Sequence, residues 1–405
     1  MKILYLAHRI PYPPNKGDKI RSFHEIKYLG SLGEVYLGAL VDNFSDMKYE
    51  KELKHWCQKV YLIPFATAKK KFLSLKGLWN GTAMSVHYFF EQALQRVVDH
   101  LISIHNFDVI FCFSSPMAEY LFRSSSQPLR KRSNLPVFIM DFCDVDSHKW
   151  KKYSEVSRWP LSQIYLKESH LLGRYEHKVA GAFDYSVFVS DREKALFEQL
   201  NPGTGQILTI SNGVDLKYFR PVPLPKNSIH GPPSLVFTGA MDYYANIDGV
   251  RWFVKEIWPH IKREAPETVF YIVGANPSPE VKQLHNNTDI IVTGYVDDVR
   301  AYYRLATVCV IPLRVARGIQ NKVLEAMAMA KPVVCTLNAF EGIEAQPGLD
   351  LITASTAQEF AKSVIELLQN RDLCEDLGRS ARYRVETHYT WERQIAPLNS
   401  IFNVL

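Results

Sequence analysis

Short apolar runs alternate with longer amphipathic segments along most of this chain, and that alternation restricts the fold more than any other feature. The chain opens with the apolar run KILYLA, a turn-rich loop, the amphipathic segment IRSFHEIKYLGSLG and a second apolar run, EVYLGALVD. Later runs of strand length are KVYLIPF, DVIFCFSS, PVFIMDFCD and YSVFVS. Because neighbouring parallel strands need helical crossovers, this order predicts an α/β protein with doubly wound parallel sheets.

A proline-dense segment interrupts the alternation. Residues 216–234, LKYFRPVPLPKNSIHGPPS, show no hydrophobic period, as is typical of a linker. A second series of alternating strand and helix patterns follows, from SLVFTGAM to KPVVCT. The chain has 405 residues, which is more than the about 250–300 residues at which a single hydrophobic core stops growing. We therefore expect two parallel-sheet domains, with a ligand cleft at the carboxyl ends of their strands.

Composition excludes several classes of protein. The chain is 47% hydrophobic and 22% charged, which is ordinary for a folded protein and argues against long disorder. No apolar run approaches the about 20 residues of a spanning helix, so we expect a cytoplasmic location, with any membrane contact peripheral and at the inner face. The net charge of +6 fits a nucleotide, a lipid phosphate or a membrane surface, but not nucleic acid, for which no motif is present. The six cysteines lack a C-x-x-C pair, which predicts reduced thiols.

The segment 311–336, IPLRVARGIQNKVLEAMAMAKPVVCT, carries the strongest chemical signal. A strand ends near Pro312, a basic loop follows, and a helix begins near Asn321. Helix N-termini attract phosphate because their free N–H groups and dipole favour negative charge. Three cations gather at this end: Arg314, Arg317 and Lys322. The pattern predicts a clamp for a diphosphate.

Two further residues of this segment fit a nucleotide. Gly318 would let the backbone approach the phosphates without a clash from a Cβ atom. Glu325 lies one helical turn beyond Lys322, where its carboxylate can accept hydrogen bonds from a ribose diol. A solvated basic loop followed by a surface glutamate fits the spacing equally well, so spacing alone leaves both interpretations open.

Several motifs resemble a known family. N-K-V-L-E-A-M-A-x-x-K-P-V-V resembles the signature of retaining glycosyltransferase family 4, and ISNGVDLKYFRP is similar to the segment between that family's domains. TGYVDDVRAYYRLATVCVIPL resembles its C-terminal half, so the likeness covers most of residues 180–395. GDKIRSF, DFCDVDSHKW and GAMDYYANIDGVRWF look like the sugar transferases of the PEP-CTERM/exosortase exopolysaccharide system.

The resemblance implies the GT-B fold, in which two Rossmann-like domains face each other across a cleft. Residues 1–215 would bind the acceptor, residues 235–387 the nucleotide sugar, and the segment 388–405 would pack back on the first domain. The implied reaction is retaining transfer of a sugar from a UDP- or GDP-sugar to a lipid-linked saccharide or exopolysaccharide precursor. It implies no cofactor and no metal ion, so the D-V-D of residues 144–146 is incidental.

Donor-binding residues follow from the same motifs. Glu325 matches the second carboxylate of the family's E-x7-E motif, which holds the ribose hydroxyls. The other matches are glycines and residues of the nucleobase turn: Gly17, Gly274, Gly294, Tyr295 and Val296. The first carboxylate of E-x7-E is absent, because Arg317 stands there, and the loop GAMDYYANID lacks the Arg and Lys of many members. We expect the positive charge to have moved to Arg314, Arg317 and Lys322, with the last two acting in catalysis.

The N-terminal half carries candidate acceptor-side carboxylates. DFCDVDS follows an apolar strand, which places Asp141, Asp144 and Asp146 at the strand's carboxyl end. Asp144 is the candidate catalytic residue, as a base or as a stabiliser of positive charge in the transition state. The alternative is that these residues cap the helix that begins near Ser147. His148 is a weaker candidate.

Basic residues outside that motif have two interpretations. Lys19 and Arg21, in the loop after the first strand, would touch the acceptor or be solvated. Lys69–Asn80 and Tyr153–Pro160 mix cations with aromatic residues, which suits either a lipid interface or packing on the N-terminal domain.

Two other functions remain as alternatives. A nucleotide-sugar epimerase on the same fold would convert the donor without an acceptor. A non-catalytic, membrane-associated scaffold need bind neither UDP nor GDP, and Arg317 in place of a carboxylate gives this alternative some weight. A nicotinamide dehydrogenase is disfavoured because no G-x-G-x-x-G follows a strand.

The displaced-charge hypothesis predicts the effect of Arg317→Ala. Loss of the cation should raise the donor KM or lower kcat by at least about tenfold, which corresponds to about 1.4 kcal/mol. Steady-state kinetics with varied nucleotide sugar measure both constants, and a variant with wild-type kinetics would contradict the role.

Overall fold

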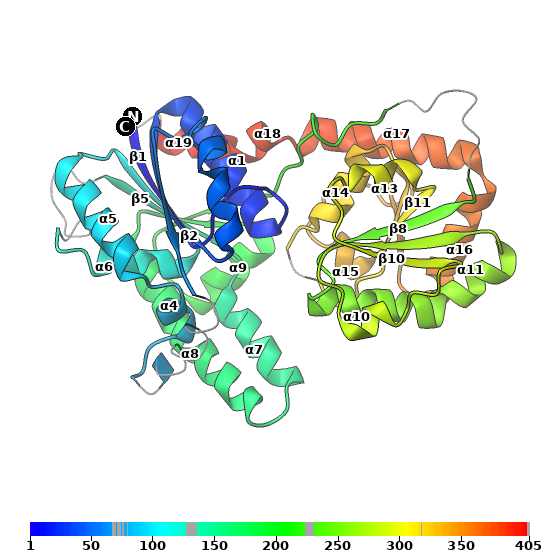
Figure 1. The fold of residues 1–405 in the computed structure, drawn as a ribbon, viewed down its shortest axis with the longest axis horizontal. Coiled ribbons are helices and arrows are strands. Elements are labelled where there is room, and N and C mark those ends of the chain that lie inside the picture. Colours follow the sequence, from blue (N-terminus) through cyan, green and yellow to red (C-terminus); the bar gives the residue numbers. More distant parts are fainter. Residues whose placement is uncertain are drawn as a thin grey trace. The chain divides into compact units, whose positions relative to one another are not determined.

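The chain forms two compact units. The computed structural model describes residues 1–66, 70, 74, 77, 78, 80–126, 136–222, 231–316 and 318–402. Unit 1 comprises Met1–Ser211 and Ile395–Leu405, and unit 2 comprises Asn212–Gln394 (Figure 1). Arg317 and most of Lys69–Asn80 lie outside the described residues. The division after Ser211 falls before the proline-dense segment that the sequence suggested as a linker.

Unit 1 contains a seven-stranded parallel sheet in the order β3-β2-β1-β4-β5-β6-β7. Its strands are β1 (Lys2–Ala7), β2 (Glu34–Val41), β3 (Lys59–Pro64), β4 (Val109–Phe113), β5 (Val137–Cys143), β6 (Tyr185–Phe188) and β7 (Gln206–Thr209). All five residues of β4 are buried, and so are five of the six in β1. Strands buried on both faces need nearly continuous apolar sequence, which explains the runs KILYLA and VIFCF.

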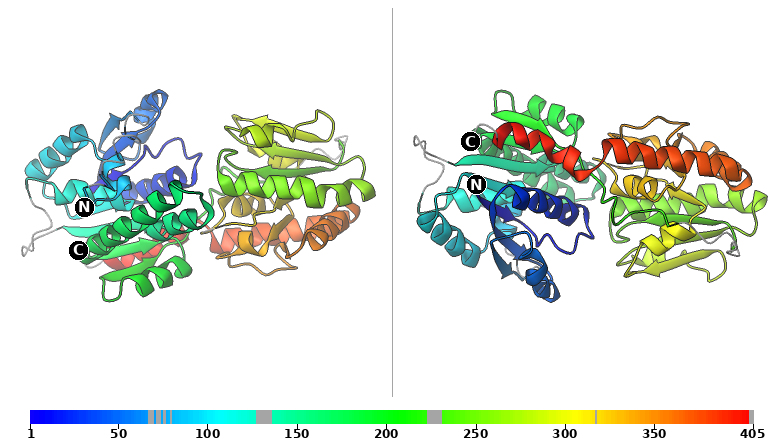
Figure 2. Two further views of the ribbon diagram at one scale, coloured as in Figure 1. Left: turned by 90° about the horizontal axis from the view of Figure 1, so that it is seen from below. Right: turned by 90° about the horizontal axis from the view of Figure 1, so that it is seen from above.

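Helices cover both faces of this sheet (Figures 1 and 2). The helices of unit 1 are α1 (Gly17–Leu32), α2 (Glu50–Leu53), α4 (Met84–Tyr88), α5 (Gln92–Ile104), α6 (Glu119–Phe122), α7 (Asp146–Val156), α8 (Leu161–Ala182), α9 (Asp191–Leu200) and α19 (Asn399–Phe402), with the 3-10 helix η1 (Phe44–Tyr49). The Tyr28 hydroxyl of α1 donates to the side-chain oxygen of Asn399, and Leu398 and Ile401 are buried, so the C-terminal segment packs within unit 1.

Unit 2 contains a six-stranded parallel sheet in the order β10-β9-β8-β11-β12-β13. Its strands are β8 (Ser234–Thr238), β9 (Val269–Val273), β10 (Ile290–Gly294), β11 (Val308–Ile311), β12 (Val333–Thr336) and β13 (Ile352–Ala354). Its helices are α10 (Tyr244–Trp252), α11 (Trp258–Glu264), α12 (Pro279–Lys282), α13 (Arg300–Leu305), α14 (Asn321–Ala328), α15 (Leu337–Phe340), α16 (Ala357–Gln369), α17 (Arg371–His388) and α18 (Trp391–Ile395). A five-residue π-helical turn, Phe253–Ile257, joins α10 to α11.

The strand order reverses once in each sheet, and these points predict where a ligand binds. Chain order runs outward from β1 to β3 on one side and from β4 to β7 on the other; in unit 2 the reversal lies between β8 and β11. Loops on the two sides of a reversal diverge, which leaves a crevice at the carboxyl ends of the strands. None of the helices built from described residues has the length and apolarity needed to cross a bilayer. The six cysteines are free thiols, four of them buried.

A buried ion-pair network ties α1 to the centre of the first sheet. Arg21, only 1% exposed, donates from Nε to Asp141 Oδ2 at 2.7 Å and from Nη1 to the carbonyl oxygen of Ile210 at 2.6 Å. Arg21 also lies 3.1 Å from Glu25, which accepts a 2.6 Å hydrogen bond from the Tyr5 hydroxyl. Burial and the adjacent Asp141 raise the pKa of Glu25 well above its ordinary value. The network therefore joins α1, β1, β5 and the residue that follows β7.

Removal of the buried cation should destabilise unit 1 strongly. Arg21→Ala would leave the buried Asp141 side chain without its main partner, and breaking a buried ion pair in this way costs about 3–5 kcal/mol. Urea unfolding followed by circular dichroism measures the change. Arg379→Ala is the control, because the Arg379–Asp376 pair is solvent-exposed and its loss should change the free energy of unfolding little. A loss below about 1 kcal/mol for Arg21→Ala would contradict the structural role.

Candidate functional site

Gly239 and Gly274, which together we call the glycine floor, lie at the strand ends beside the reversal of unit 2, where strand order predicts a ligand crevice. Gly239 follows β8 and Gly274 follows β9, and a Cβ atom on Gly274 would lie 1.7 Å from the Gly239 carbonyl oxygen. Gly274 also has a φ of +154°, a conformation that favours glycine. Its N–H donates to the carbonyl of Gly294, at the end of β10, at 3.2 Å. The ends of β8, β9 and β10 therefore approach one another through backbone atoms of glycine, without side chains between them.

Lys322 reaches this floor from the first turn of α14. Its Nζ donates to Asn246 Oδ1 at 2.5 Å and lies 4.3 Å above the ring centre of Phe237. A Cβ atom on Gly239 would lie 2.9 Å from Nζ, so a glycine there gives the ammonium its space. Asn246 is oriented in turn by the Ala240 carbonyl, which accepts from its Nδ2 at 2.8 Å.

The protein interior makes the charge on Lys322 costly. Burial lowers the pKa of Lys322 to about 7, although the nearby Glu325 carboxylate raises it in part. Most of α14 is apolar and buried, but Lys322 and Glu325 keep some exposed surface. The Gln320 side chain donates to the Gly318 carbonyl and does not cap the helix. An anion at this helix terminus would supply the negative charge that a protonated Lys322 needs.

Glu325 is held by a second chain of hydrogen bonds. The Tyr303 hydroxyl donates to Glu325 Oε2 at 2.9 Å, and the Thr238 hydroxyl lies 2.8 Å from the same Tyr303 oxygen. Burial raises the pKa of Glu325, and the Tyr303 hydrogen bond and Lys322 oppose that rise. The carboxylate therefore lies one helical turn from Lys322 with a fixed orientation.

The other expected cations do not join Lys322. Arg314 points to α10, where Nε donates to Asp248 Oδ2 at 2.9 Å and Nη2 donates to Oδ1, with the Trp252 ring centre 5.9 Å away. The Asp248 hydrogen bond raises the pKa of Arg314. Arg317 lies outside the described residues, and its neighbour Gly318 has a φ of +58°. The structure thus brings together Lys322 and Glu325, with Arg314 engaged elsewhere.

The turn after β10 presents an exposed aromatic ring. Tyr295 is 68% exposed, next to Gly294 with its φ of +70°, while Val296 packs against the core of unit 2. An exposed tyrosine beside a bare backbone turn offers a flat apolar surface to a planar ligand. These three residues therefore lie at the same edge of the sheet as Gly274.

In unit 1, Asp144 is the candidate carboxylate with unused hydrogen-bonding capacity. It lies just after β5, and its buried Oδ1 accepts no hydrogen bond from the described residues. Burial and the neighbouring carboxylates of Glu193 and Asp146 raise the pKa of Asp144 to about 7. Glu193 itself accepts from the Val145 N–H at 2.8 Å. Asp144 is therefore poised to change protonation near neutral pH.

The other acceptor-side candidates of unit 1 are occupied. Arg21 and Asp141, 1% and 0% exposed, bond to each other in the interior and present no surface to an acceptor. Lys19 is also buried, paired with Asp46 at 2.7 Å. Asp146 opens α7 and lies 3.3 Å from Lys149. We expected these residues to face an acceptor at the carboxyl end of the sheet. Sequence spacing predicted that location, but it could not reveal the ion-pair partners that the fold supplies.

Two more candidates of unit 1 lie on helices at the same edge. Gly17 begins α1, with open space where a Cβ atom would lie. His148 lies in the first turn of α7. Both positions are compatible with an approaching ligand, and neither shows a contact that defines one.

Four residues of the two sites were not found from the sequence. They are Asn246, Tyr303, Thr238 and Glu193. Asn246 belongs to GAMDYYANID, the loop in which the resemblance led us to look for cations. The amide side chain in that loop was the sequence signal that could have identified it. The other three lie in ordinary strand and helix patterns, so only their spatial proximity identifies them.

Comparison with known proteins finds a similarity to one family within unit 2. Residues 232–370 match the family described as "Glycosyl transferases group 1". The matched residues include the glycine floor, Lys322 and Glu325. The match agrees with the sequence-based expectation of a glycosyltransferase, and the GT-B fold expected from the sequence is confirmed by structures of such enzymes.

One sequence relative and several solved structures match nearly the whole chain. A protein of Klebsiella pneumoniae, named "Uncharacterized 44.6 kDa protein in cps region", is 21% identical over 411 residues, or 96% of each chain. A sucrose-phosphate synthase from Thermosynechococcus elongatus has a TM-score of 0.69 at 16% identity, over 100% of this chain and 99% of its own. HepE of Anabaena, solved with UDP and glucose, has a TM-score of 0.67 at 14% identity over 100% of both chains.

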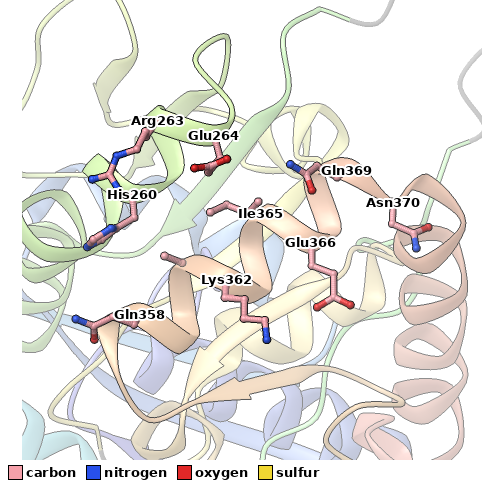
Figure 3. A pocket seen from close by; sticks show the side chains of 10 residues that line it. His260, Arg263, Glu264, Gln358, Lys362, Ile365, Glu366, Gln369 and Asn370 are labelled. Atoms are coloured by element: carbon pink, nitrogen blue, oxygen red, sulfur yellow. The ribbon is translucent and has the colours of Figure 1, made fainter.

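A groove elsewhere in the glycosyl transferase domain lies between α11 and α16 (Figure 3). Its volume is about 610 Å³. Side chains of mixed charge line it, including His260, Arg263, Glu264, Lys362 and Glu366. No residue expected to bind the donor lies there. Across the described residues, no group of three or more His, Cys, Asp or Glu side chains is arranged to hold a metal ion.

The close approach of β8 and β9 predicts that Gly274→Ala is severe. A methyl group would collide with the Gly239 carbonyl in a backbone conformation that side chains rarely adopt, so we expect a loss of about 3 kcal/mol or more. Thermal unfolding measures it. The control Gly181→Ala, on α8 with open space around the added methyl, should be neutral or slightly stabilising. Equal unfolding temperatures for the two variants would contradict the proposed contact.

Proposed function

We propose that this protein is a retaining glycosyltransferase of the family 4 type. It would transfer a sugar from a UDP- or GDP-sugar to a lipid-linked saccharide or exopolysaccharide precursor, in a PEP-CTERM-type polysaccharide system. The observation that carries the proposal is the pair formed by Lys322, held by Asn246, and Glu325, held by Tyr303. Both lie at the strand reversal of a group 1 glycosyl transferase domain.

The donor fits the chemistry of this pair. The diphosphate would bind at the first turn of α14, where Lys322 and the helix dipole favour negative charge. Glu325 would accept hydrogen bonds from the ribose hydroxyls, and Tyr295 would contact the base. Gly239, Gly274 and Gly294 would let the ligand approach the backbone. HepE, which shares the fold, has been solved with UDP and with UDP-glucose, and this supports a nucleotide-sugar donor.

The reaction breaks the bond between the sugar's anomeric carbon and the diphosphate oxygen. The acceptor hydroxyl oxygen forms the new bond to that carbon, and its proton passes to the departing diphosphate. Negative charge develops on the leaving group, so a cation placed beforehand in a partly desolvated site lowers the barrier. Lys322 supplies that cation, Arg317 is proposed as a second one, and Arg314 would join only after leaving Asp248.

Asp144 is the proposed acceptor-side carboxylate. Its unused Oδ1 and its pKa near 7 suit a group that accepts a hydrogen bond from an acceptor hydroxyl or stabilises developing positive charge. Two relatives support a surface-polysaccharide acceptor. One is named for its place in a cps region, and WaaG, of the same fold, is a glycosyltransferase involved in lipopolysaccharide biosynthesis.

The remaining features of the proposal concern setting and metal use. We propose a cytoplasmic enzyme that works without cofactor or metal ion and touches the inner face of the membrane. Transfer that persists in the presence of EDTA would support metal independence.

An NMR time course tests the activity directly. The protein is incubated with UDP- and GDP-sugars, with and without a lipid-linked saccharide acceptor. Glycosyl transfer that depends on the acceptor, with retained anomeric configuration, is the expected result. Conversion of the donor sugar without acceptor would replace the proposal with an epimerase. Absence of both reactions and of UDP or GDP binding in calorimetry would replace it with a scaffold.

The lowered pKa of Lys322 predicts pH-dependent donor binding. Below about pH 7 the ammonium is charged before the donor arrives, whereas above it each binding event must take up a proton. UDP-glucose affinity should therefore fall as pH rises from about 6 to about 9, by at most tenfold per pH unit. UDP-glucose is the probe because its diphosphate lacks the terminal phosphate group that titrates near pH 6.

Calorimetry across this pH range measures the dependence. Lys322→Met should bind weakly at every pH. Lys255→Met is the control, because Lys255 is exposed and pairs with its exposed neighbour Glu256, and it should keep the wild-type profile. A flat wild-type profile would contradict the role of Lys322.

A further inference from the structure

The tip of the α7–α8 hairpin exposes apolar side chains that a folded protein normally covers. α7 ends at Val156 and α8 begins at Leu161. Val156 is 75% exposed, Trp159 81% and Leu161 49%. Single exposed apolar residues are ordinary, but three within six positions at one turn, including the most exposed tryptophan among the described residues, form a patch. Figure 1 shows the hairpin extending beyond the first sheet, with its tip away from the strands.

Contacts between the two helices and with α4 hold the hairpin tip in place. Between its two helices, the rings of Trp150 and Tyr165 lie 5.2 Å apart, and Tyr153 contacts both. At its base, the Glu168 carboxylate accepts hydrogen bonds from the N–H groups of Met84 and Ser85 at 2.5 and 2.9 Å. Rigid presentation lowers the entropic cost of binding a partner.

Positive charge surrounds the apolar tip. Residues 149–167 contain five cations and one carboxylate, Glu155. The cations are Lys149, Lys151, Lys152, Arg158 and Lys167. Lys151, Lys152 and Arg158 are exposed and flank the tip, and Lys152 pairs with Glu155 at 3.4 Å. The tip therefore combines an apolar end with a basic collar.

We infer that this tip docks into the surface of an anionic phospholipid bilayer. Tryptophan prefers the boundary between headgroups and acyl chains, where its ring is buried and its N–H stays hydrated. Valine and leucine enter the acyl region, and the collar of cations meets the lipid phosphates. A protein partner would need a larger complementary surface than three side chains at a turn provide.

The position of the hairpin connects this docking with the proposed reaction. α7 begins two residues after Asp144, and its eleven residues span about 16 Å. The tip thus projects from the edge of the sheet that carries the proposed acceptor carboxylate. A bilayer at the tip would hold a lipid-linked acceptor within reach of that edge. This consequence rests on the proposed function, whereas lipid binding itself does not.

Vesicle co-sedimentation tests the inference with the full chain. Wild type should bind vesicles of phosphatidylglycerol mixed with phosphatidylcholine at least about tenfold more strongly than pure phosphatidylcholine, and salt should weaken the binding. Trp159→Ser and the double variant Lys151→Glu/Lys152→Glu should each lose at least about tenfold in apparent affinity. These residues are exposed, so unfolding temperatures should stay at the wild-type value.

The matched control is Phe44→Ser. Phe44, on η1 of the same unit, is 75% exposed but lacks the basic collar, so its loss should leave vesicle binding unchanged. Equal wild-type affinity for both kinds of vesicle, or wild-type binding by Trp159→Ser, would overturn the inference.

A separate measurement distinguishes the inference from the proposed function. Trp159→Ser should keep wild-type affinity for UDP-glucose and lose transfer only to an acceptor embedded in vesicles. If wild type binds anionic vesicles but no nucleotide sugar, the proposed function fails and lipid docking stands. If it transfers sugar but ignores vesicles, docking and the proposed membrane contact fail, and the glycosyltransferase activity stands.

Discussion

The site in unit 2 depends on how closely β8 and β9 approach where they end. Gly274 lies so near the Gly239 carbonyl that no side chain fits between them, and Gly239 leaves room for the ammonium of Lys322. Because this space is walled by Phe237 and the apolar side of α14, the ammonium loses hydration and its pKa falls. Asn246 compensates with a neutral oxygen, which orients the charge without cancelling it. A carboxylate in its place would neutralise Lys322 and weaken its attraction for an anion.

Unit 1 handles charge differently at the corresponding edge of its sheet. Its first loop is rich in cations, but the structure pairs them internally: Arg9 with Asp18 at 2.6 Å and Lys19 with Asp46 at 2.7 Å. Arg21 and Asp141 brace the interior. Asp144 stands apart, because its neighbours Glu193 and Asp146 share its sign and its Oδ1 lacks a hydrogen bond from the described residues. The paired residues therefore stabilise unit 1. Asp144 instead carries an energetic cost, because its carboxylate is buried near like charges, and this cost points to a role in ligand binding.

Pattern reasoning predicted elements better than partners. The alternation of apolar runs identified most strands but not the short β13, because burial on both faces of a parallel sheet imposes its own sequence pattern. The segment IRSFHEIKYLGSLG forms most of α1 and its C-cap, Gly33. The start of α14 near Asn321 and the pairing of Lys322 with Glu325 on one helical face followed from local spacing. Arg314 shows the limit of that approach. It lies in the expected loop, but Asp248, 66 positions earlier in the chain, holds it against α10.

The sequence by itself determined an α/β chain with two series of parallel strands, a helix opening with a cation, and a carboxylate one turn later. These features depend on residues close together along the chain, so periodicity and spacing record them. The tertiary structure alone decided which charges are neutralised: Arg21 and Lys19 are buried with acids, whereas Lys322 faces an amide and Asp144 faces other carboxylates. Such contacts join residues far apart in the chain, and the cost of a charge depends on burial and partners that only folding supplies.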